Sequence, residues 1–177
     1  MQKVFMLGCL AAVLAPLPGS TLQQLSLDDM IRLSTAIVHG KAQQTTPSYK
    51  GSIIYTHYNV QVSETLKGRA ASQFDVAVPG GAANRYQQTF AGAPNLTRGQ
   101  DYVFFLWTSN SGLTQIIGLS QGLFVVSTNS SGQLMVMREA SGERMVNNAG
   151  QPVTDSAMQM LLSDLRSLIQ KTAGGAK

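Results

Sequence analysis

The sequence predicts a mainly β domain, built as a barrel or a sandwich, with a short helix near its start and an amphipathic helix at its end. Over residues 53–68 the even positions are mostly apolar or β-branched, and the odd positions from residue 57 onward are polar. This alternation with a period of two indicates one long strand with a buried face and a wet face. Over residues 158–169, by contrast, apolar side chains recur at helical spacing. Charged residues make up only 12% of the chain, which is typical of turn-rich β-proteins.

The first 20 residues read as a signal peptide that is removed on export. Lys3 supplies a positive charge, an almost wholly apolar run follows from Val4 to Ala15, and the segment Pro16–Ser20 breaks the helix. The apolar run is shorter than the roughly 20 residues that a helix needs to cross a bilayer. We therefore expect a secreted or periplasmic protein with no integral membrane span after signal removal, and a single domain over residues 21–177.

The only cysteine of the chain, Cys9, lies inside this leader in a Leu-Gly-Cys context. Most of the apolar run follows Cys9, whereas a lipoprotein signal has its apolar run before the cysteine, so lipidation is the less favoured alternative. A mature chain without cysteine forms no disulfide and performs no thiol chemistry.

The charge pattern argues against a nucleic-acid partner. The formal net charge is +4, but the Lys and Arg residues are scattered singly, without a basic run or a basic helix face. The glycine-rich segments lack the Lys-Ser/Thr that follows a phosphate-binding loop. We expect no cofactor.

A short helix over residues 25–33 opens the domain. Ser26 is a suitable N-cap, and Asp28 and Asp29 place negative charge at the positive end of the helix dipole. Its apolar residues share one face, which we expect to cover an open end of the β-structure.

Residues 35–42 form the first strand, which we expect to pair with the long strand as an antiparallel hairpin. The register that sets buried residues opposite each other places Ala42 opposite Ile54 and leaves residues 43–52 as a polar loop. Gly40, in the middle of this strand, indicates a bend or a bulge.

Further strands are predicted over residues 74–78, 102–108, 113–119, 123–127 and 134–138. Residues 102–108 are apolar on both faces and should form the most buried strand. We expect residues 113–119 and 123–127 to pair with each other through a turn at residues 120–122.

The last predicted element is an amphipathic helix over residues 154–171, capped by Thr154 or Asp155 and ended by Gly174. Its apolar face must pack on the β-structure or on a partner chain, because a lone helix of this length is marginal in water.

The sequence Gly118-x-Ser120-x-Gly122 fits the nucleophile elbow of hydrolases. That motif needs a helix after the serine and a histidine further along the chain. Here the following segment is strand-like and no histidine lies beyond His57, so we interpret the motif as a tight turn.

The two histidines, His39 and His57, lie opposite each other on the wet face in the predicted register. A zinc site needs at least one further protein ligand, and the same face offers Lys41, Tyr55 and Asn59 but no carboxylate. We interpret the histidines as a solvated surface pair, with a metal site as the less favoured alternative.

Residues 79–100 form the longest irregular segment and are the predicted binding site. They carry Arg85, Tyr86 and Phe90 among small residues, and aromatic and Arg side chains commonly anchor protein interfaces. We expect a non-catalytic module that binds another extracellular or periplasmic protein through these three residues. Two alternatives stay open: a loop folded on its own aromatic side chains, and a hydrolase that uses two of the nine acidic residues.

Three stretches resemble the pattern of netrin/TIMP-like domains: residues 34–42, the strand that runs into Leu66-Lys67-Gly68, and Gly99-x-x-Tyr102-x-x-Phe105. The chain is also similar to a set of uncharacterised secreted bacterial proteins that carry Val-Pro-Gly-Gly and Gly-Ala-Pro loops, found here at residues 78–81 and 92–94. The resemblance covers about residues 25–127.

This resemblance implies an OB-like β-barrel, closed or partly open, with a helix against it. It also implies, as an alternative within binding, a protease inhibitor or a protease-associated domain. Inhibitors of the TIMP type present an N-terminal cysteine to a catalytic zinc, and a mature chain without cysteine cannot use that mechanism.

Overall fold

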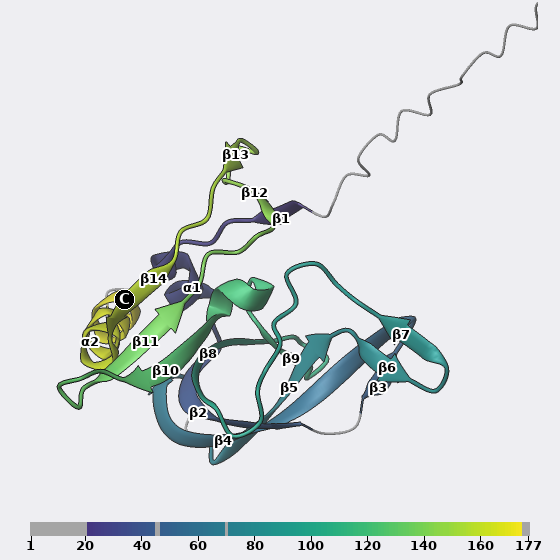
Figure 1. The fold of residues 1–177 in the computed structure, drawn as a ribbon, viewed down its shortest axis with the longest axis horizontal. Helices are drawn as coiled ribbons and strands as arrows, with labels where there is room; N and C mark the ends of the chain where they lie inside the picture. Colours follow the sequence, from purple (N-terminus) through teal and green to yellow (C-terminus); the bar gives the residue numbers. More distant parts are fainter. Residues whose placement is uncertain (1–20, 45–46, 70, 175–177) are drawn as a thin grey trace, which may run out of the picture.

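The computed structural model describes residues 21–44, 47–69 and 71–174. The predicted signal peptide, residues 1–20, lies outside the described residues. The described part is mainly β, with one short helix near its start and one longer helix at its end (Figure 1), so the predicted class is confirmed. None of its helices is long and apolar enough to span a bilayer.

The elements follow one another along the chain as β1 (Thr21–Gln23), α1 (Leu27–Leu33), β2 (Ala36–Gln44), β3 (Ser48–Lys50), β4 (Ile53–Lys67), β5 (Gln73–Pro79), β6 (Gly81–Ala83), β7 (Tyr86–Gln88), β8 (Asp101–Thr108), β9 (Thr114–Ile116), the 3₁₀ helix η1 (Leu119–Gly122), β10 (Leu123–Thr128), β11 (Leu134–Arg138), β12 (Arg144–Val146), β13 (Pro152–Val153), β14 (Met158–Leu161) and α2 (Leu162–Gly174).

The main sheet has the strand order β14-β11-β10-β8-β2-β4-β3, with β5 also paired to β4 and β9 also paired to β8. Strands β1, β12 and β13 form a separate small sheet, and β6 and β7 form a hairpin. The hydrogen-bonded order does not return to its first strand, so the sheets are not closed. A closed barrel of the OB type therefore stays a prediction.

Strand β4 has the alternation that the sequence predicts. Its even residues Ile54, Thr56, Tyr58 and Val60 are buried, whereas their odd neighbours are more exposed. The strand pairs with β2 and β3 along one edge and with β5 along the other.

The predicted register of the first hairpin is wrong. Ala42 lies opposite Val60 instead of Ile54. Strand β3 lies within the range 43–52 that was predicted as a polar loop, and it continues the pairing with β4 up to Lys50, which lies opposite Ile53. The turn therefore falls between these two residues, where Gly51 has φ +64°, a backbone angle suited to tight hairpin turns.

Gly40 marks a bulge, as predicted. The pairing of β2 with β4 shifts between His39 and Gly40. A Cβ atom at Gly40 would lie 2.2 Å from the carbonyl oxygen of Gln61, so the two backbones approach closely only because residue 40 has no side chain.

Strand β8 is the most buried strand, as predicted, because two cores meet on it. Phe104 and Leu106 belong to one core, which they share with residues of β2, β4 and β5. Val103 and Phe105 point to the opposite face and pack in a second core, which α1 and α2 cover.

The predicted pairing of residues 113–119 with residues 123–127 is wrong. Strands β9 and β10 both pair antiparallel with β8 and so run in the same direction. Between them η1 replaces the expected turn. Gly118 caps η1 in the left-handed conformation, and a Cβ atom at Gly122 would lie 2.4 Å from the carbonyl oxygen of Ile117.

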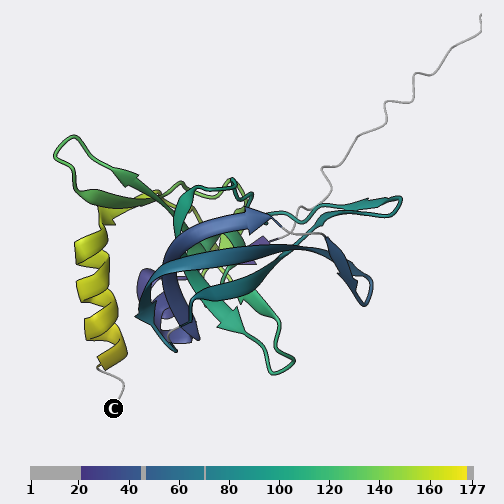
Figure 2. The same cartoon turned by 90° about the horizontal axis from the view of Figure 1, so that it is seen from below.

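The predicted start of the last helix at Thr154 or Asp155 is also wrong. Helix α2 begins at Leu162, and the preceding Met158–Leu161 segment is the edge strand β14. Asp155 does not cap a helix, because its carboxylate is engaged by Arg138. The helix buries Leu162, Leu165 and Ile169, and it lies alongside the sheet (Figure 2).

Candidate functional site

The segment predicted as irregular contains the hairpin β6–β7 and then a loop that leads to β8. Ala83 pairs with Tyr86, so Asn84 and Arg85 form the tip. Asn84 has φ +56°, and Asn tolerates this left-handed conformation better than most residues. The hairpin extends away from the body of the sheet (Figures 1 and 2).

The structure places the three predicted binding residues at two locations. Arg85 and Tyr86 lie at the hairpin tip, where Arg85 is exposed and Tyr86 is 70% exposed. Phe90 lies beyond β7, is 38% exposed, and lines a cavity that neither Arg85 nor Tyr86 reaches. The three residues therefore do not form one cluster, since strand β7 separates Phe90 from the tip.

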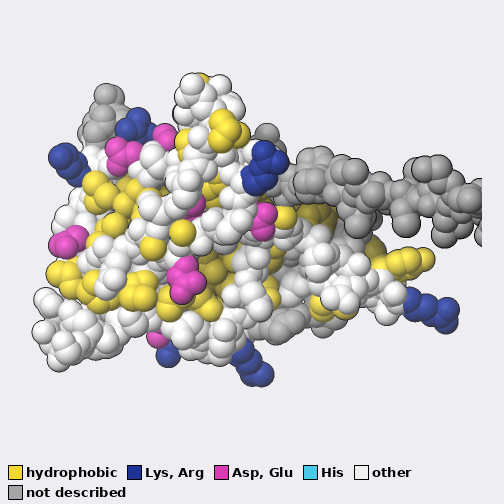
Figure 3. All heavy atoms as spheres, turned by 45° about the horizontal axis from the view of Figure 1, so that its top comes forward, with side chains coloured by type: hydrophobic (Ala, Val, Ile, Leu, Met, Phe, Trp, Pro, Cys, Tyr) yellow, Lys and Arg dark blue, Asp and Glu magenta, His cyan; other side chains and the backbone are white. Residues whose placement is uncertain are grey.

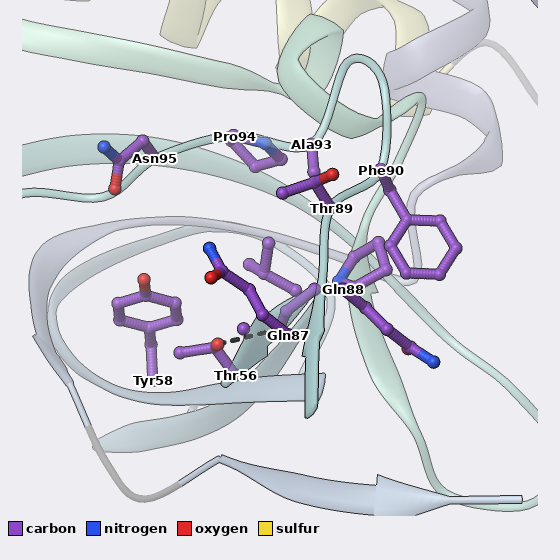
Figure 4. Close-up of a pocket in the computed structure, with 13 residues that line it drawn as sticks. Thr56, Tyr58, Gln87, Gln88, Thr89, Phe90, Ala93, Pro94 and Asn95 are labelled. Atoms are coloured by element: carbon purple, nitrogen blue, oxygen red, sulfur yellow. Dashed lines mark hydrogen bonds between the residues drawn. The ribbon is translucent and has the colours of Figure 1, made fainter. Parts of the chain in front are cut away.

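The cavity has a volume of about 390 Å³. The strand β4, the end of β5, strand β7 and the loop over residues 89–95 form its walls (Figure 4). No charged side chain belongs to its lining; the residues are Thr56, Tyr58, Val78, Pro79, Gly80, Gly81, Gln87, Gln88, Thr89, Phe90, Ala93, Pro94 and Asn95.

The floor of the cavity carries the hydroxyl of Tyr58. This side chain comes from the buried face of β4, is 7% exposed, and points toward the loop that carries Asn95 (Figure 4). Its hydroxyl makes no hydrogen bond to another residue of the described part of the chain. Burial, and to a smaller degree the neighbouring Tyr102, raises the pKa of Tyr58, so its hydroxyl is neutral at physiological pH.

Hydrogen bonds within the wall hold β7 and the end of β5 against β4. Gln88 accepts from the backbone N–H of Ile54 at 2.7 Å and donates to the carbonyl of Ser52 at 2.8 Å. The hydroxyl of Thr56 donates to the carbonyl of Gly80 at 2.8 Å. A Cβ atom at Gly81 would lie 2.4 Å from this hydroxyl, so the Pro-Gly-Gly sequence allows the chain to close over Thr56.

The loop over residues 89–95 is held at its middle residue, Gly92. The N–H of Gly92 donates to Glu143 at 3.1 Å, and its carbonyl accepts from the N–H of Ser120 at 3.0 Å. Beyond the loop, Leu96 is buried in the core that lies under the cavity. The side chains of Thr89 and Asn95 make no hydrogen bond to other described residues.

Ser120 lies in η1, and strand β10 follows it, so the Gly-x-Ser-x-Gly motif is a turn and not a nucleophile elbow. Ser120 lines a second cavity of about 430 Å³ beside Val125 and Met137, and no histidine belongs to that lining. This cavity shares Pro94 and Asn95 with the first one.

The predicted pairing of the two histidines is wrong, because it followed from the wrong register. His39 lies opposite Glu64 and Val103, and His57 lies opposite Ala77. The prediction that their face has no carboxylate is wrong as well, because strands β5 and β8 bring one to each histidine.

Asp101 lies 3.4 Å from Nε2 of His39, and Asp75 lies 2.8 Å from Nδ1 of His57. Within the described ranges, no group of three or more His, Cys, Asp or Glu side chains is placed to hold a metal ion.

The sequence did not point to Tyr58, Gln87, Thr89 or Asn95. Tyr58 occupies an apolar-face position of β4 and reads as a core residue, and only the fold shows that it lies at the edge of the core. The side chain of Gln88 points to β4, and its neighbour Gln87 points the other way because side chains alternate along β7. The hairpin is too short for this alternation to be recognised in the sequence.

Comparisons of this chain with protein-family models, with curated proteins and with solved structures find no significant match.

Proposed function

We propose that the protein is an exported binding module, secreted or periplasmic, that captures another protein through the hairpin β6–β7 and the neighbouring cavity. The observation that carries this proposal is the cavity wall. Four neutral side chains that make no hydrogen bond to another described residue, from Tyr58, Gln87, Thr89 and Asn95, surround it next to the ring of Phe90. A few polar groups that converge on a concave site are the usual means by which a binding site orients its ligand.

The charges of the site favour a neutral group of the partner inside the cavity. Its lining offers no counter-ion, and a buried charge without a partner is costly. An amide or hydroxyl of the partner can instead exchange hydrogen bonds with the Tyr58 hydroxyl and with the Gln87 and Asn95 amides. The basic side chains on the face shown in Figure 3 are scattered singly, which gives no support to a nucleic-acid partner.

The hairpin tip supports a macromolecular partner. Tyr86 presents a large, exposed aromatic surface, the preceding residue Arg85 is exposed as well, and these residue types dominate the binding energy of protein interfaces. The hydroxyl of Tyr49 donates to the carbonyl of Ala83 at 3.2 Å, so the hairpin is braced against β3. The scaffold that we propose is an OB-like barrel, which the core shared by β2, β4, β5 and β8 supports.

A pull-down from the native secretome with the immobilised mature chain tests the function. We expect Arg85→Ala and Tyr86→Ala together, and Phe90→Ala separately, each to abolish capture of one protein while the thermal midpoint stays within a few degrees. Ser120→Ala is the control and should capture that protein normally. Equal capture by all variants would overturn the proposed site. If the captured protein is a protease whose activity falls on binding, the module is an inhibitor.

A further inference from the structure

The outer face of β4, which is opposite to the cavity, carries a line of three polar side chains from three neighbouring strands. Ser48 comes from β3, His57 from β4 and Asp75 from β5. Tyr58 and His57 are adjacent in the sequence, so they point to opposite faces of the sheet. The proposed binding cavity and this line of residues are therefore separate sites.

The three side chains are connected by hydrogen bonds. Nδ1 of His57 lies 2.8 Å from Oδ2 of Asp75, and Nε2 lies 2.9 Å from the hydroxyl of Ser48. A carboxylate can only accept, so a proton on Nδ1 makes the ring donate to Asp75 and leaves Nε2 to accept from the serine hydroxyl. This is the tautomer that a histidine needs to act as the base for a serine nucleophile.

We infer that Ser48 is an activated nucleophile, with His57 as its general base and Asp75 as the residue that positions the base. The inference concerns an acyl-transfer activity toward short esters, and it is independent of the proposed protein binding. Short acyl groups fit because Ser48 is exposed and none of the cavities described above reaches it.

The exposure of the three residues fits these roles. The His57 side chain is 22% exposed, so its ring is held between its neighbours while its partners stay accessible. Ser48 is exposed to an incoming ester. The Asp75 side chain is 64% exposed, so solvent screens its charge, and its contribution is mainly to orient the ring and to hold the proton on Nδ1.

A backbone donor lies next to the nucleophile. Tyr49 pairs with Ile54, whose N–H donates to Gln88 and whose carbonyl accepts from the N–H of Gly80. The backbone N–H and carbonyl of Ile54 therefore point away from β3. In an antiparallel pair of this kind, the opposite residue, Tyr49, also points its backbone N–H and carbonyl away from the partner strand. The N–H of Tyr49 therefore faces the open edge of the sheet, and the N–H after the nucleophile is a position at which hydrolases stabilise the oxyanion.

The chemistry of the site is a two-step ester hydrolysis. Ser48 Oγ forms a bond to the acyl carbon while its proton passes to Nε2 of His57; the ester C–O bond breaks, and the alcohol leaves with that proton. Water then attacks the acyl carbon and gives a proton to Nε2. The bond to Oγ breaks, Oγ recovers the proton, and the carboxylic acid is released.

Reaction of the purified chain with a fluorophosphonate probe, followed by peptide mass spectrometry, tests this inference. We expect a single covalent adduct on Ser48 and release of p-nitrophenol from p-nitrophenyl acetate. Ser48→Ala should abolish both signals, and His57→Gln should slow the labelling by about 10²-fold or more, the usual contribution of a general base. Ser63→Ala, which removes an exposed hydroxyl further along β4, and Ser120→Ala are the controls and should react like the wild type.

The role of Asp75 is tested by comparing two variants. Asp75→Asn should slow the labelling, whereas Asp75→Glu should restore part of the rate because it keeps the carboxylate; circular dichroism melts confirm that each variant is folded. An adduct that persists in Ser48→Ala, or a wild-type labelling rate in His57→Gln, would overturn the inference. Absence of an adduct on the wild-type chain would also overturn it and would assign the three residues to an ordinary surface network.

Discussion

Arg138 and Asp155 form a bidentate ion pair that is almost completely removed from solvent. Nη1 of Arg138 lies 2.6 Å from Oδ2 of Asp155, Nη2 lies 3.0 Å from Oδ1, and the two side chains are 5% and 2% exposed. Arg138 also donates to the carbonyl of Ser156, and Asp155 accepts from the N–H of Ser141. The pair therefore ties both ends of the segment over residues 139–157 to the end of β11.

Asp155→Asn should lower the free energy of unfolding by about 3–5 kcal/mol, because it leaves the buried guanidinium without its counter-charge. Urea unfolding of the two proteins measures the difference. Asp28→Asn is the matched control, since Asp28 faces Arg32 at 3.5 Å with both side chains more than half exposed, and exposed pairs contribute about 0–1 kcal/mol. Similar losses of unfolding free energy in both variants would show that the buried Arg138–Asp155 pair contributes no more than an exposed pair.

The same pair should make the protein sensitive to acid. Burial raises the pKa of Asp155, but the hydrogen bonds from Arg138 and Ser141 and the charge of Arg138 outweigh it, so the pKa lies below its ordinary value. A carboxylate whose pKa is lower in the folded than in the unfolded state stabilises the fold above the unfolded pKa, which is about 3.9. This contribution is lost as the pH falls through the folded pKa.

Urea midpoints measured from pH 6 down to pH 2.5 should therefore fall more steeply for the wild type than for Asp155→Asn. Parallel curves for the two proteins would assign the acid sensitivity to other carboxylates.

Local patterns of the sequence predicted most of the helices and strands. The features that were predicted wrongly depend on pairings between residues that are distant in the chain. The alternation of β4 and the capping of α1 by Ser26, whose hydroxyl accepts from the N–H of Asp29 at 3.1 Å, depend on residues close in the chain. The register of the first hairpin depends on the turn at Gly51 and the bulge at Gly40, and each moves the pairing of every later residue. The predicted start of α2 was wrong for a similar reason, since Arg138, which binds the Asp155 carboxylate, lies far from Asp155 in the sequence.

The candidate sites show the same division. The composition of residues 79–100 indicated a binding segment, and Phe90 does line a cavity. Tyr58 could not be predicted, because a tyrosine at a buried strand position looks like any other core residue. The line from Ser48 through His57 to Asp75 needs the pairing of three strands, and Ser48 lies in a segment that read as a polar loop.

Helix α2 should contribute strongly to stability through its buried face. Leu165 is 0% exposed and packs in the core beside α1. Leu165→Ala should lower the free energy of unfolding by about 2–5 kcal/mol, as buried leucines do elsewhere. Ser163→Ala, on the exposed side of the helix, should be nearly silent in the same urea titration. Equal losses at the two positions would contradict the assignment of Leu165 to the buried face and of Ser163 to the exposed face.

Gly40→Ala should destabilise the fold although it adds only one methyl group. The new Cβ would lie 2.2 Å from the Gln61 carbonyl oxygen, so β2 and β4 must separate, and overpacking of this kind costs about 1–3 kcal/mol. Gly142→Ala is the control, because a Cβ atom there meets no atom within 4 Å. Thermal melts should separate the two variants clearly, and an unchanged midpoint in Gly40→Ala would mean that the bulge is not a close contact.

Tyr58→Phe tests whether the floor of the cavity contributes to binding. The change removes one hydroxyl that makes no hydrogen bond to another described residue, so the thermal midpoint should stay the same or rise slightly. If the partner exchanges a hydrogen bond with that hydroxyl, its loss should weaken binding by about 2- to 13-fold, which corresponds to the usual net value of about 0.5–1.5 kcal/mol. Calorimetric titration with the captured partner measures this change.

Tyr55→Phe is the matched control, since Tyr55 lies on the opposite face of the same strand, and its affinity should equal that of the wild type. Because the pKa of Tyr58 is raised, its hydroxyl stays protonated, and the affinity of the wild type should not change between pH 7 and 9 through this group. An equal affinity for Tyr58→Phe and the wild type would show that the partner makes no hydrogen bond to the Tyr58 hydroxyl.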